Sequence, residues 1–354
     1  MRWSRFPLFV LPALLLACGV SGEDPSPLER GPALVDHVVL VSLDGLRPDA
    51  IEAAGASTLV SLRERGAFCP AAETIRPSIT LPSHTSMLTG LDFRRHGVVW
   101  NNYRPGHLER PSVFSRARRA GLSTAMYFSK DKFHFIADPK WVDRIHGPPV
   151  PKTVPPLQDY SDPAYLAQEE EKERRAAQTP PQPSSRPPAK PRPEELATRA
   201  EALARLFSEE WPRRRYALTF VHLREPDEFG HRYGWMGPEY LEAVRACDRA
   251  VGEILRTIEE AGLLDRTALL VTADHGGLGK KHFLRAEPDR LENVRIPWIC
   301  MAPGLKPGLR IDRPVRTYDT AATVLAFLGV PAPEGIDGRP VLEVLAREAL
   351  PAGR

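Results

Sequence analysis

The stretch that decides the fold is VDHVVLVSLDG, residues 35–45, a continuous apolar run that ends in an acid and a glycine. Two later stretches repeat this plan, YALTFVHLREPD at residues 216–227 and RTALLVTADHGG at residues 266–277. Unbroken apolar runs of this length indicate strands that are buried on both faces of a mostly parallel sheet. Periodic apolar residues predict helices between them, within residues 193–211 and 238–262. The sequence therefore predicts an α/β fold with helices on both faces of the sheet.

The bulk composition is that of a globular protein. The chain has 354 residues, of which 42% are apolar and 26% charged, enough for one large domain or two smaller ones. The net charge of +3 is too small to argue for nucleic acid, and no nucleic-acid-binding surface is indicated. Cys69, Cys247 and Cys300 form no CxxC pair, so we expect buried thiols, although one disulfide is compatible with an oxidising compartment.

The N-terminus has the pattern of an export signal. Arg2 and Arg5 precede FPLFVLPALLLA, an apolar stretch too short and too broken by proline to span a bilayer. It ends in LLAC, which resembles the bacterial lipobox, in which the cysteine, here Cys18, is lipidated. We therefore expect an exported bacterial lipoprotein, membrane-anchored in the periplasm or at the cell surface. The alternative is a plain secretory signal with a chance cysteine.

The remaining chain divides by composition. Residues 1–18 are the predicted signal peptide, 19–34 a flexible tether, 35–345 a single domain, and 346–354 a C-terminal tail. Within the domain, residues 147–193 carry thirteen prolines and the charged block QEEEKERRAAQ. This composition cannot bury a core, so we expect a surface insertion or flexible loop.

Three strand-like runs end in acids, which are Asp44, Asp227 and Asp274. In an open α/β sheet, ligands bind at the carboxyl ends of the strands. Each acid alone suits a turn or a cap, but three together would repel one another unless cations held them.

Histidines accompany two of these acids. His231 follows Asp227 at i+4, His275 follows Asp274 directly, and His282 comes seven residues later in GKKH. Carboxylate and imidazole together suit zinc or a similar divalent ion better than calcium. The pattern predicts a metal site at this edge of the sheet.

IRPSITLPSHTSMLTG, residues 75–90, poses a separate question about Thr80. It lies two residues before Pro82, where a helix is expected to begin. Threonine is a favoured N-cap and proline suits the first turn, so this stretch alone favours a capping role. The alternative is that Thr80 is a nucleophile.

Five motifs now resemble one family. SLDGLRPD, TLPSH followed by MLTG, HGVVWNN, EPDEFGH and TADHGG are similar to signatures of the alkaline phosphatase superfamily, nearest its type I phosphodiesterase/nucleotide pyrophosphatase branch. The similarity covers residues 36–110 and 212–345. The resemblance implies a three-layer α/β/α sandwich with a mostly parallel central sheet. It also implies a hydrolase that acts on phosphoric ester bonds of small substrates.

The resemblance also implies two divalent metal ions, most simply Zn2+. One ion would be held by Asp227, His231 and a third histidine. The other would be held by Asp44, Asp274, His275 and the oxygen of the nucleophile. In the nucleotide pyrophosphatases the third histidine lies further downstream. His282 is the last histidine of this chain and fits the GxxH loop of some related members, so we assign it to the first ion.

The nucleophile of this branch maps to Thr80, which would form a phospho-threonine intermediate that water hydrolyses. Asn101 matches the asparagine that hydrogen-bonds a non-bridging phosphoryl oxygen, and Asn102 is a second choice. His84 matches a motif position that packs under the site.

Three alternatives stay open on the sequence alone. A phosphotransferase that moves a head group to a surface acceptor would use the same nucleophile and metals. A sulfatase needs C/S-x-P-x-R, whereas this chain has TLPSH at residues 80–84. A surface binding lipoprotein built on an enzyme fold that no longer catalyses would have lost metal ligands, whereas all of these positions still carry residues able to perform their roles. Four lysines are candidates to contact phosphate oxygens, with a solvated role as the alternative: Lys130, Lys132, Lys280 and Lys281.

Overall fold

The computed structural model describes residues 26–178, 199–283 and 287–346. The predicted signal peptide and Cys18 lie outside the described residues, so lipidation stays a prediction. Among the helices of the described part, none has both the length and the apolar character that a membrane span requires.

The three apolar runs form the centre of one eight-stranded sheet. They are β1 (His37–Leu43), β5 (Leu218–Leu223) and β6 (Thr267–Thr272), and every residue in them is buried. β1 pairs in parallel with β5 on one side and β6 on the other, so that Leu40 lies opposite both Phe220 and Leu270. Burial on both faces explains why these runs lack alternation between apolar and polar residues.

Five shorter strands complete the sheet in the order β4-β3-β5-β1-β6-β7-β2-β8. They are β2 (Ala67–Cys69), β3 (Thr124–Tyr127), β4 (Arg144–His146), β7 (Trp298–Met301) and β8 (Leu309–Arg310). Only β7 runs antiparallel to its neighbours β6 and β2 among the described strands. The predicted α/β class with a mostly parallel sheet is confirmed.

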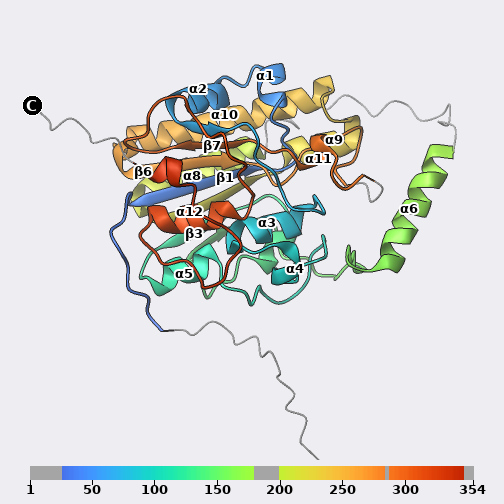
Figure 1. Cartoon of the computed structure of the whole chain (residues 1–354), viewed down its shortest axis with the longest axis horizontal. Helices are drawn as coiled ribbons and strands as arrows, with labels where there is room; N and C mark the ends of the chain where they lie inside the picture. The colour runs from blue at the N-terminus through green and yellow to red at the C-terminus, as the bar shows by residue number, and fades with distance from the viewer. Residues whose placement is uncertain (1–25, 179–198, 284–286, 347–354) are drawn as a thin grey trace, which may run out of the picture.

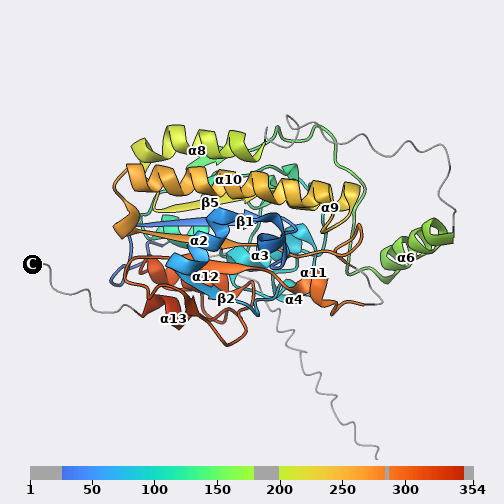
Figure 2. The same cartoon turned by 90° about the horizontal axis from the view of Figure 1, so that it is seen from above.

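Helices cover both faces of the sheet, as Figure 1 and the turned view of Figure 2 show. One layer contains α1 (Ala50–Ala54), α2 (Ser57–Arg65), α8 (Ala200–Arg214), α9 (Glu225–Tyr233) and α10 (Pro238–Glu260). The opposite layer contains α3 (Thr80–Thr89), α5 (Val113–Arg119) and α12 (Asp319–Phe327). Shorter helices lie in the connections: α4 (Phe93–His96), α11 (Leu291–Val294) and α13 (Leu342–Leu345).

The proline-rich segment differs in one respect from its prediction. Residues 163–178 form the helix α6 (Pro163–Gln178), which projects from the body in Figures 1 and 2, so a flexible loop is wrong there. Glu171 forms ion pairs with Arg174 and Arg175, and Glu169 forms one with Lys172. Such pairs, together with good helix formers, stabilise an exposed helix without a buried face.

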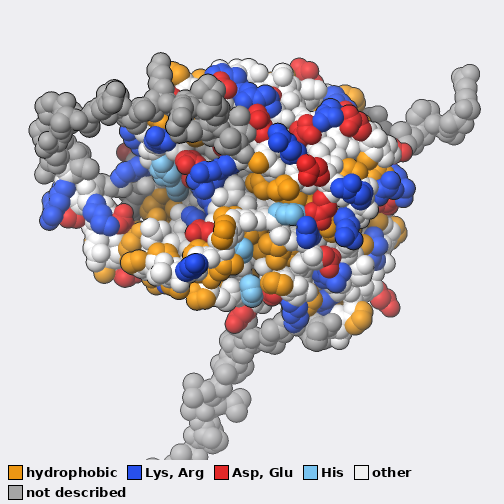
Figure 3. Space-filling view, turned by 180° about the vertical axis from the view of Figure 1, so that it is seen from behind, with side chains coloured by type: hydrophobic (Ala, Val, Ile, Leu, Met, Phe, Trp, Pro, Cys, Tyr) orange, Lys and Arg blue, Asp and Glu red, His pale blue; other side chains and the backbone are white. Residues whose placement is uncertain are grey.

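The described cysteines form no disulfide, and the surface carries charges of both signs. Cys69, Cys247 and Cys300 are free and buried, as the absence of paired cysteine motifs suggested. Over the face shown in Figure 3, Lys and Arg side chains lie among Asp and Glu side chains. Mixed charge of this kind is typical of a solvated surface.

Candidate active site

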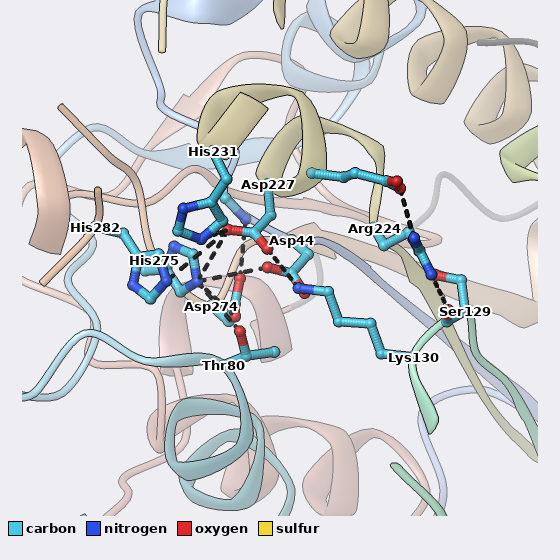
Figure 4. A network of polar contacts seen from close by, with 12 residues as sticks. Asp44, Thr80, Ser129, Lys130, Arg224, Asp227, His231, Asp274, His275 and His282 are labelled. Carbon is cyan, nitrogen blue, oxygen red and sulfur yellow. Dashed lines mark hydrogen bonds and ion pairs between the residues drawn. The ribbon is translucent and has the colours of Figure 1, made fainter. Parts of the chain in front are cut away.

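Three strand ends bring three carboxylates to one edge of the sheet. Asp44 follows β1, Asp274 follows β6, and Asp227 lies in the first turn of α9, directly after β5. All three side chains are buried, and Figure 4 shows them pointing toward one another. Because the three strands are parallel neighbours, their carboxyl ends meet at the same place.

Gly45 allows the turn after β1 to pack directly against α9. Its φ is 73°, and a Cβ at this position would lie 2.8 Å from the Cα atom of Asp227. Its amide donates to Asp274 Oδ1 at 3.1 Å, while the amide of Asp227 donates to the carbonyl of Asp44 at 2.9 Å. A single glycine thus sets the spacing between all three acids.

Each carboxylate has one oxygen engaged by the protein. Asp44 Oδ2 accepts from His222 at 2.9 Å and lies 2.5 Å from the ammonium of Lys130. The same ammonium lies 2.6 Å from Asp227 Oδ2. These contacts bind the Oδ2 atoms of Asp44 and Asp227 and fix both carboxylates in place.

The second oxygen of each carboxylate has no hydrogen-bond partner in the described structure: Asp44 Oδ1, Asp227 Oδ1 and Asp274 Oδ2. All three lie around one nitrogen, His275 Nε2, at 3.5, 3.9 and 3.3 Å respectively. Buried polar atoms without partners are rare because they cost free energy. The donor set therefore fits a bound divalent cation.

The histidines are oriented to offer a lone pair. His231 Nδ1, His275 Nδ1 and His282 Nδ1 contact the backbone carbonyls of Lys280, Gly276 and Ser78 at 2.9, 2.8 and 2.5 Å. A carbonyl only accepts, so in each ring the Nδ1 atom carries a proton, and the Nε2 atom of the neutral ring is the one with a lone pair. This arrangement is typical of metal-binding histidines.

The predicted ligands fall into two overlapping groups. Asp44, Asp274 and His275 offer atoms within 4.8 Å of one another, as the sequence predicted for one ion. For the other ion, the atoms within this range belong to Asp227, His282 and His275 rather than to His231. His231 still adjoins the group, because its Nε2 atom lies 3.2 Å from Asp227 Oδ1.

Burial and neighbouring charges shift the pKa values of these groups. Burial and the charge of Asp44 raise the pKa of Asp274 well above its usual value. For His275, burial lowers the pKa despite the nearby Asp227 and Asp44 carboxylates. Burial would also lower the pKa of His231, but the hydrogen bond to Asp227 outweighs it, so that this pKa is raised. The lowered pKa of His275 favours the neutral imidazole, which is the form that ligates metal, whereas a metal at His231 would displace a proton that Asp227 stabilises.

Thr80 does not cap its helix. It is the first residue of α3, which begins two residues before Pro82, and the N-cap is Ile79, with no side-chain cap. Thr80 is buried, and its Oγ1 atom lies 3.5 Å from His275 Nε2. The capping interpretation is therefore wrong, and the hydroxyl faces the carboxylate cluster (Figure 4).

Asn101 lies next to Thr80, whereas Asn102 points elsewhere. Asn101 Oδ1 accepts from the amide of Leu81 and from Lys132 Nζ, both at 3.0 Å. Two donors on this oxygen fix the orientation of the amide and leave its NH2 end as the donor. Asn102 instead donates to the carbonyl of Pro156.

Part of this cluster of side chains opens onto a cavity of about 740 Å³. Its inner wall includes Thr80, Asn101, Lys130, Lys132, Asp227, His231 and His282, and its outer wall includes residues 148–152. Lys280 and Lys281 line a neighbouring pocket beside His231 and His282.

His84 and His222 lie beneath the site. His84 contacts the carbonyl of Thr80 and the hydroxyl of Ser42, each at 2.8 Å, and is fully buried. His222 positions Asp44, as described above. Lys130, which we expected to contact phosphate or to be solvated, instead pairs with two of the acids, and neither it nor His222 has a ligand spacing that indicates such contacts.

The chain belongs to the type I phosphodiesterase / nucleotide pyrophosphatase family, whose model matches residues 38–280. Arylsulfatase K of Danio rerio is 31% identical over 112 residues, which cover 31% of this chain and 21% of that protein. The 2,3-bisphosphoglycerate-independent phosphoglycerate mutase of Synechococcus elongatus is 31% identical over 140 residues, 38% of this chain and 25% of that protein. The chain thus spans a quarter or less of the length of these curated relatives.

Solved structures share the fold. The phosphonate monoester hydrolase SpPMH from Silicibacter pomeroyi has a TM-score of 0.59 and 19% identity, covering 90% of this chain and 78% of its own. Murine ectonucleotide pyrophosphatase / phosphodiesterase 5 has a TM-score of 0.56 and 14% identity, covering 84% and 96%. At these sequence identities, the structural similarity establishes the fold and nothing about the function.

Substitution of Gly45 tests the spacing of the acids. Gly45→Ala places a methyl group against Asp227, so we expect the affinity for Zn2+ to fall by about 10-fold or more. Gly55→Ala is the matched control, because Gly55 also has a positive φ, 64°, but no atom lies near its Cβ position. Both variants lose about 1 kcal/mol of stability from the backbone conformation. Equal zinc affinity in both variants, measured by calorimetry, would contradict the assigned role of Gly45.

Proposed function

We propose that this protein is a metal-dependent phosphoric ester hydrolase that uses Thr80 as its nucleophile and forms a phospho-threonine intermediate. The observation that carries the proposal is the set of three partnerless carboxylate oxygens around His275 Nε2, beside the hydroxyl of Thr80. Membership of the type I phosphodiesterase / nucleotide pyrophosphatase family supports the same chemistry.

Two divalent ions, most simply Zn2+, fit the donor set of carboxylates and imidazoles. Asp44, Asp274, His275 and the oxygen of Thr80 would hold one ion. Asp227, His231 and His282 would hold the other. When bound, such ions lower the pKa of a coordinated hydroxyl and stabilise negative charge on phosphoryl oxygens.

The residues of the chain define the reaction course. Thr80 Oγ1 loses its proton to solvent and attacks phosphorus, while the bond from phosphorus to the leaving oxygen breaks. Thr80 is the first residue of α3, so the positive end of the helix dipole lies at the phosphoryl group. Water then cleaves the phospho-threonine ester and restores the hydroxyl group.

Asn101 would orient the phosphoryl group. Its Oδ1 atom accepts from Leu81 and Lys132 and its NH2 group bonds Tyr160, so the second N–H is the one that would donate to a non-bridging oxygen. Such donors stabilise the charge that develops in the transition state.

A sulfatase reaction is not proposed, although several curated relatives are sulfatases. Thr80 and His84 occupy the positions where the sulfatase motif requires a convertible Cys or Ser and an Arg. Transfer to an alcohol acceptor in place of water would use the same residues.

Substitution of Thr80 tests the nucleophile. Thr80→Ala should reduce the turnover of bis-p-nitrophenyl phosphate by about 10³-fold or more, since the attacking oxygen is lost, whereas Thr80→Ser should retain partial activity. Thr85→Ala is the control in the same buried helix, because the Thr85 hydroxyl bonds the carbonyl of Leu81 and lies outside the cavity.

Acid quenching during turnover, followed by peptide mass spectrometry, should place a phosphate on Thr80 of the wild-type protein. The nucleophile assignment is wrong if Thr80→Ala and Thr85→Ala proteins have equal activity.

A further inference from the structure

Lys132 is a half-buried ammonium group without a carboxylate partner. Its Nζ atom donates to Asn101 Oδ1 at 3.0 Å, and no ion pair of Lys132 occurs among the described residues. Lys130, two residues earlier, differs because its charge is shared between Asp44 and Asp227. A neutral amide does not offset a full positive charge, so Lys132 adds a positive charge to the cavity that no carboxylate contacts directly.

The ammonium is positioned for a ligand in the cavity. Lys132 and Thr80 line the same cavity wall, and Asn101 joins them, because its Oδ1 atom also accepts from Leu81, the residue after Thr80. An ammonium group has three N–H donors, and Asn101 takes one of them. The remaining donors are available to an anion held beside Thr80.

A charge count shows what this cation adds. Lys130 offsets one of the three carboxylates, Asp44, Asp227 and Asp274. With two divalent ions bound, neutral histidines and an ionised Thr80, the site without Lys132 has an excess of one positive charge. That excess matches a phosphodiester, which is a monoanion. Lys132 raises the excess to two, which matches the dianion of a phosphomonoester.

We propose that Lys132 makes the site selective for dianionic phosphoryl groups, as in phosphomonoesters, over phosphodiester monoanions. Its N–H groups contact the third unesterified oxygen, which a diester lacks. The inference rests on the proposed function and specifies its substrate class. Lys132 is thus a specificity-determining residue, and Asn101 holds its ammonium in place.

The kinetic test compares two substrates. Lys132→Met keeps the length of the aliphatic stem but removes the charge. We expect the ratio of kcat/KM for p-nitrophenyl phosphate to that for bis-p-nitrophenyl phosphate to fall about 10-fold or more, as for a lost hydrogen bond to a charged group. Lys152→Met is the control, because Lys152 is an exposed lysine on the outer wall of the same cavity. Lys132→Arg, which keeps the charge, should retain most of the ratio.

A binding test needs no turnover. The zinc-loaded wild-type and Lys132→Met proteins are titrated calorimetrically with inorganic phosphate and with dimethyl phosphate at pH 7.5. We expect Lys132→Met to weaken the binding of phosphate about 10-fold and of dimethyl phosphate less than twofold. Equal losses for both anions, or no phosphate binding at all, overturn the inference.

The two tests separate this inference from the proposed function. If the wild-type protein hydrolyses neither ester but phosphate binding depends on Lys132, the hydrolase assignment fails and the dianion site stands. If the wild-type protein is active and Lys132→Met leaves the ratio unchanged, the hydrolase stands and this inference is wrong.

The pH dependence supplies an independent readout. Burial, and then repulsion by Lys130, lowers the pKa of Lys132 to about 8, although Asp44, Asp227 and Asp131 act in the opposite direction. Lys132 is charged below this pH and loses its charge as the pH rises through it. The monoester-to-diester ratio of kcat/KM should therefore fall as the pH rises through the pKa of Lys132 in the wild-type protein, at or below pH 8 because bound cations lower this pKa further, while p-nitrophenyl phosphate stays a dianion. In the Lys132→Met protein the ratio should be flat over the same range.

Discussion

The repulsion between three buried carboxylates is the constraint on which the rest of the site depends. Asp44, Asp227 and Asp274 are brought together because three neighbouring parallel strands end at one edge of the sheet. Lys130 relieves part of the repulsion by binding the Oδ2 atoms of Asp44 and Asp227. The second oxygen of each of these carboxylates, and one oxygen of Asp274, remain without hydrogen-bond partners. Buried carboxylate oxygens without partners raise the free energy of the folded protein unless cations bind them, so the cluster indicates a cation site.

The two helical layers place the other components around this cluster. On one side, α9 supplies Asp227 and His231 and packs against the turn after β1, where Gly45 leaves room for it. On the opposite side, α3 begins with Thr80 and directs its positive end at the cluster. Thr80, the proposed nucleophile, and Asp227 thus come from helices on different faces of one sheet, and both line the cavity, while Asp44 and Asp274 lie at the strand ends.

The sequence predicted the central strands and the acids well, because buried parallel strands are continuous apolar runs and the acids follow them directly. It failed where contacts are non-local. Lys130 meets Asp227 across 97 residues, and no spacing along the chain signals such a contact. Thr80 was ambiguous, since an N-cap and an N1 nucleophile differ only in backbone geometry. The helix α6 was missed because surface ion pairs stabilise it rather than an apolar face.

The central claim is that the partnerless oxygens are metal ligands. Anomalous diffraction at the zinc edge, on crystals of the zinc-loaded protein, tests it most directly. We predict two peaks, one bound by Asp44, Asp274 and His275 and in contact with Thr80 Oγ1, and one bound by Asp227, His231 and His282. Crystals in saturating zinc that show no peak at these carboxylates, with Lys130 still between Asp44 and Asp227, would contradict the account.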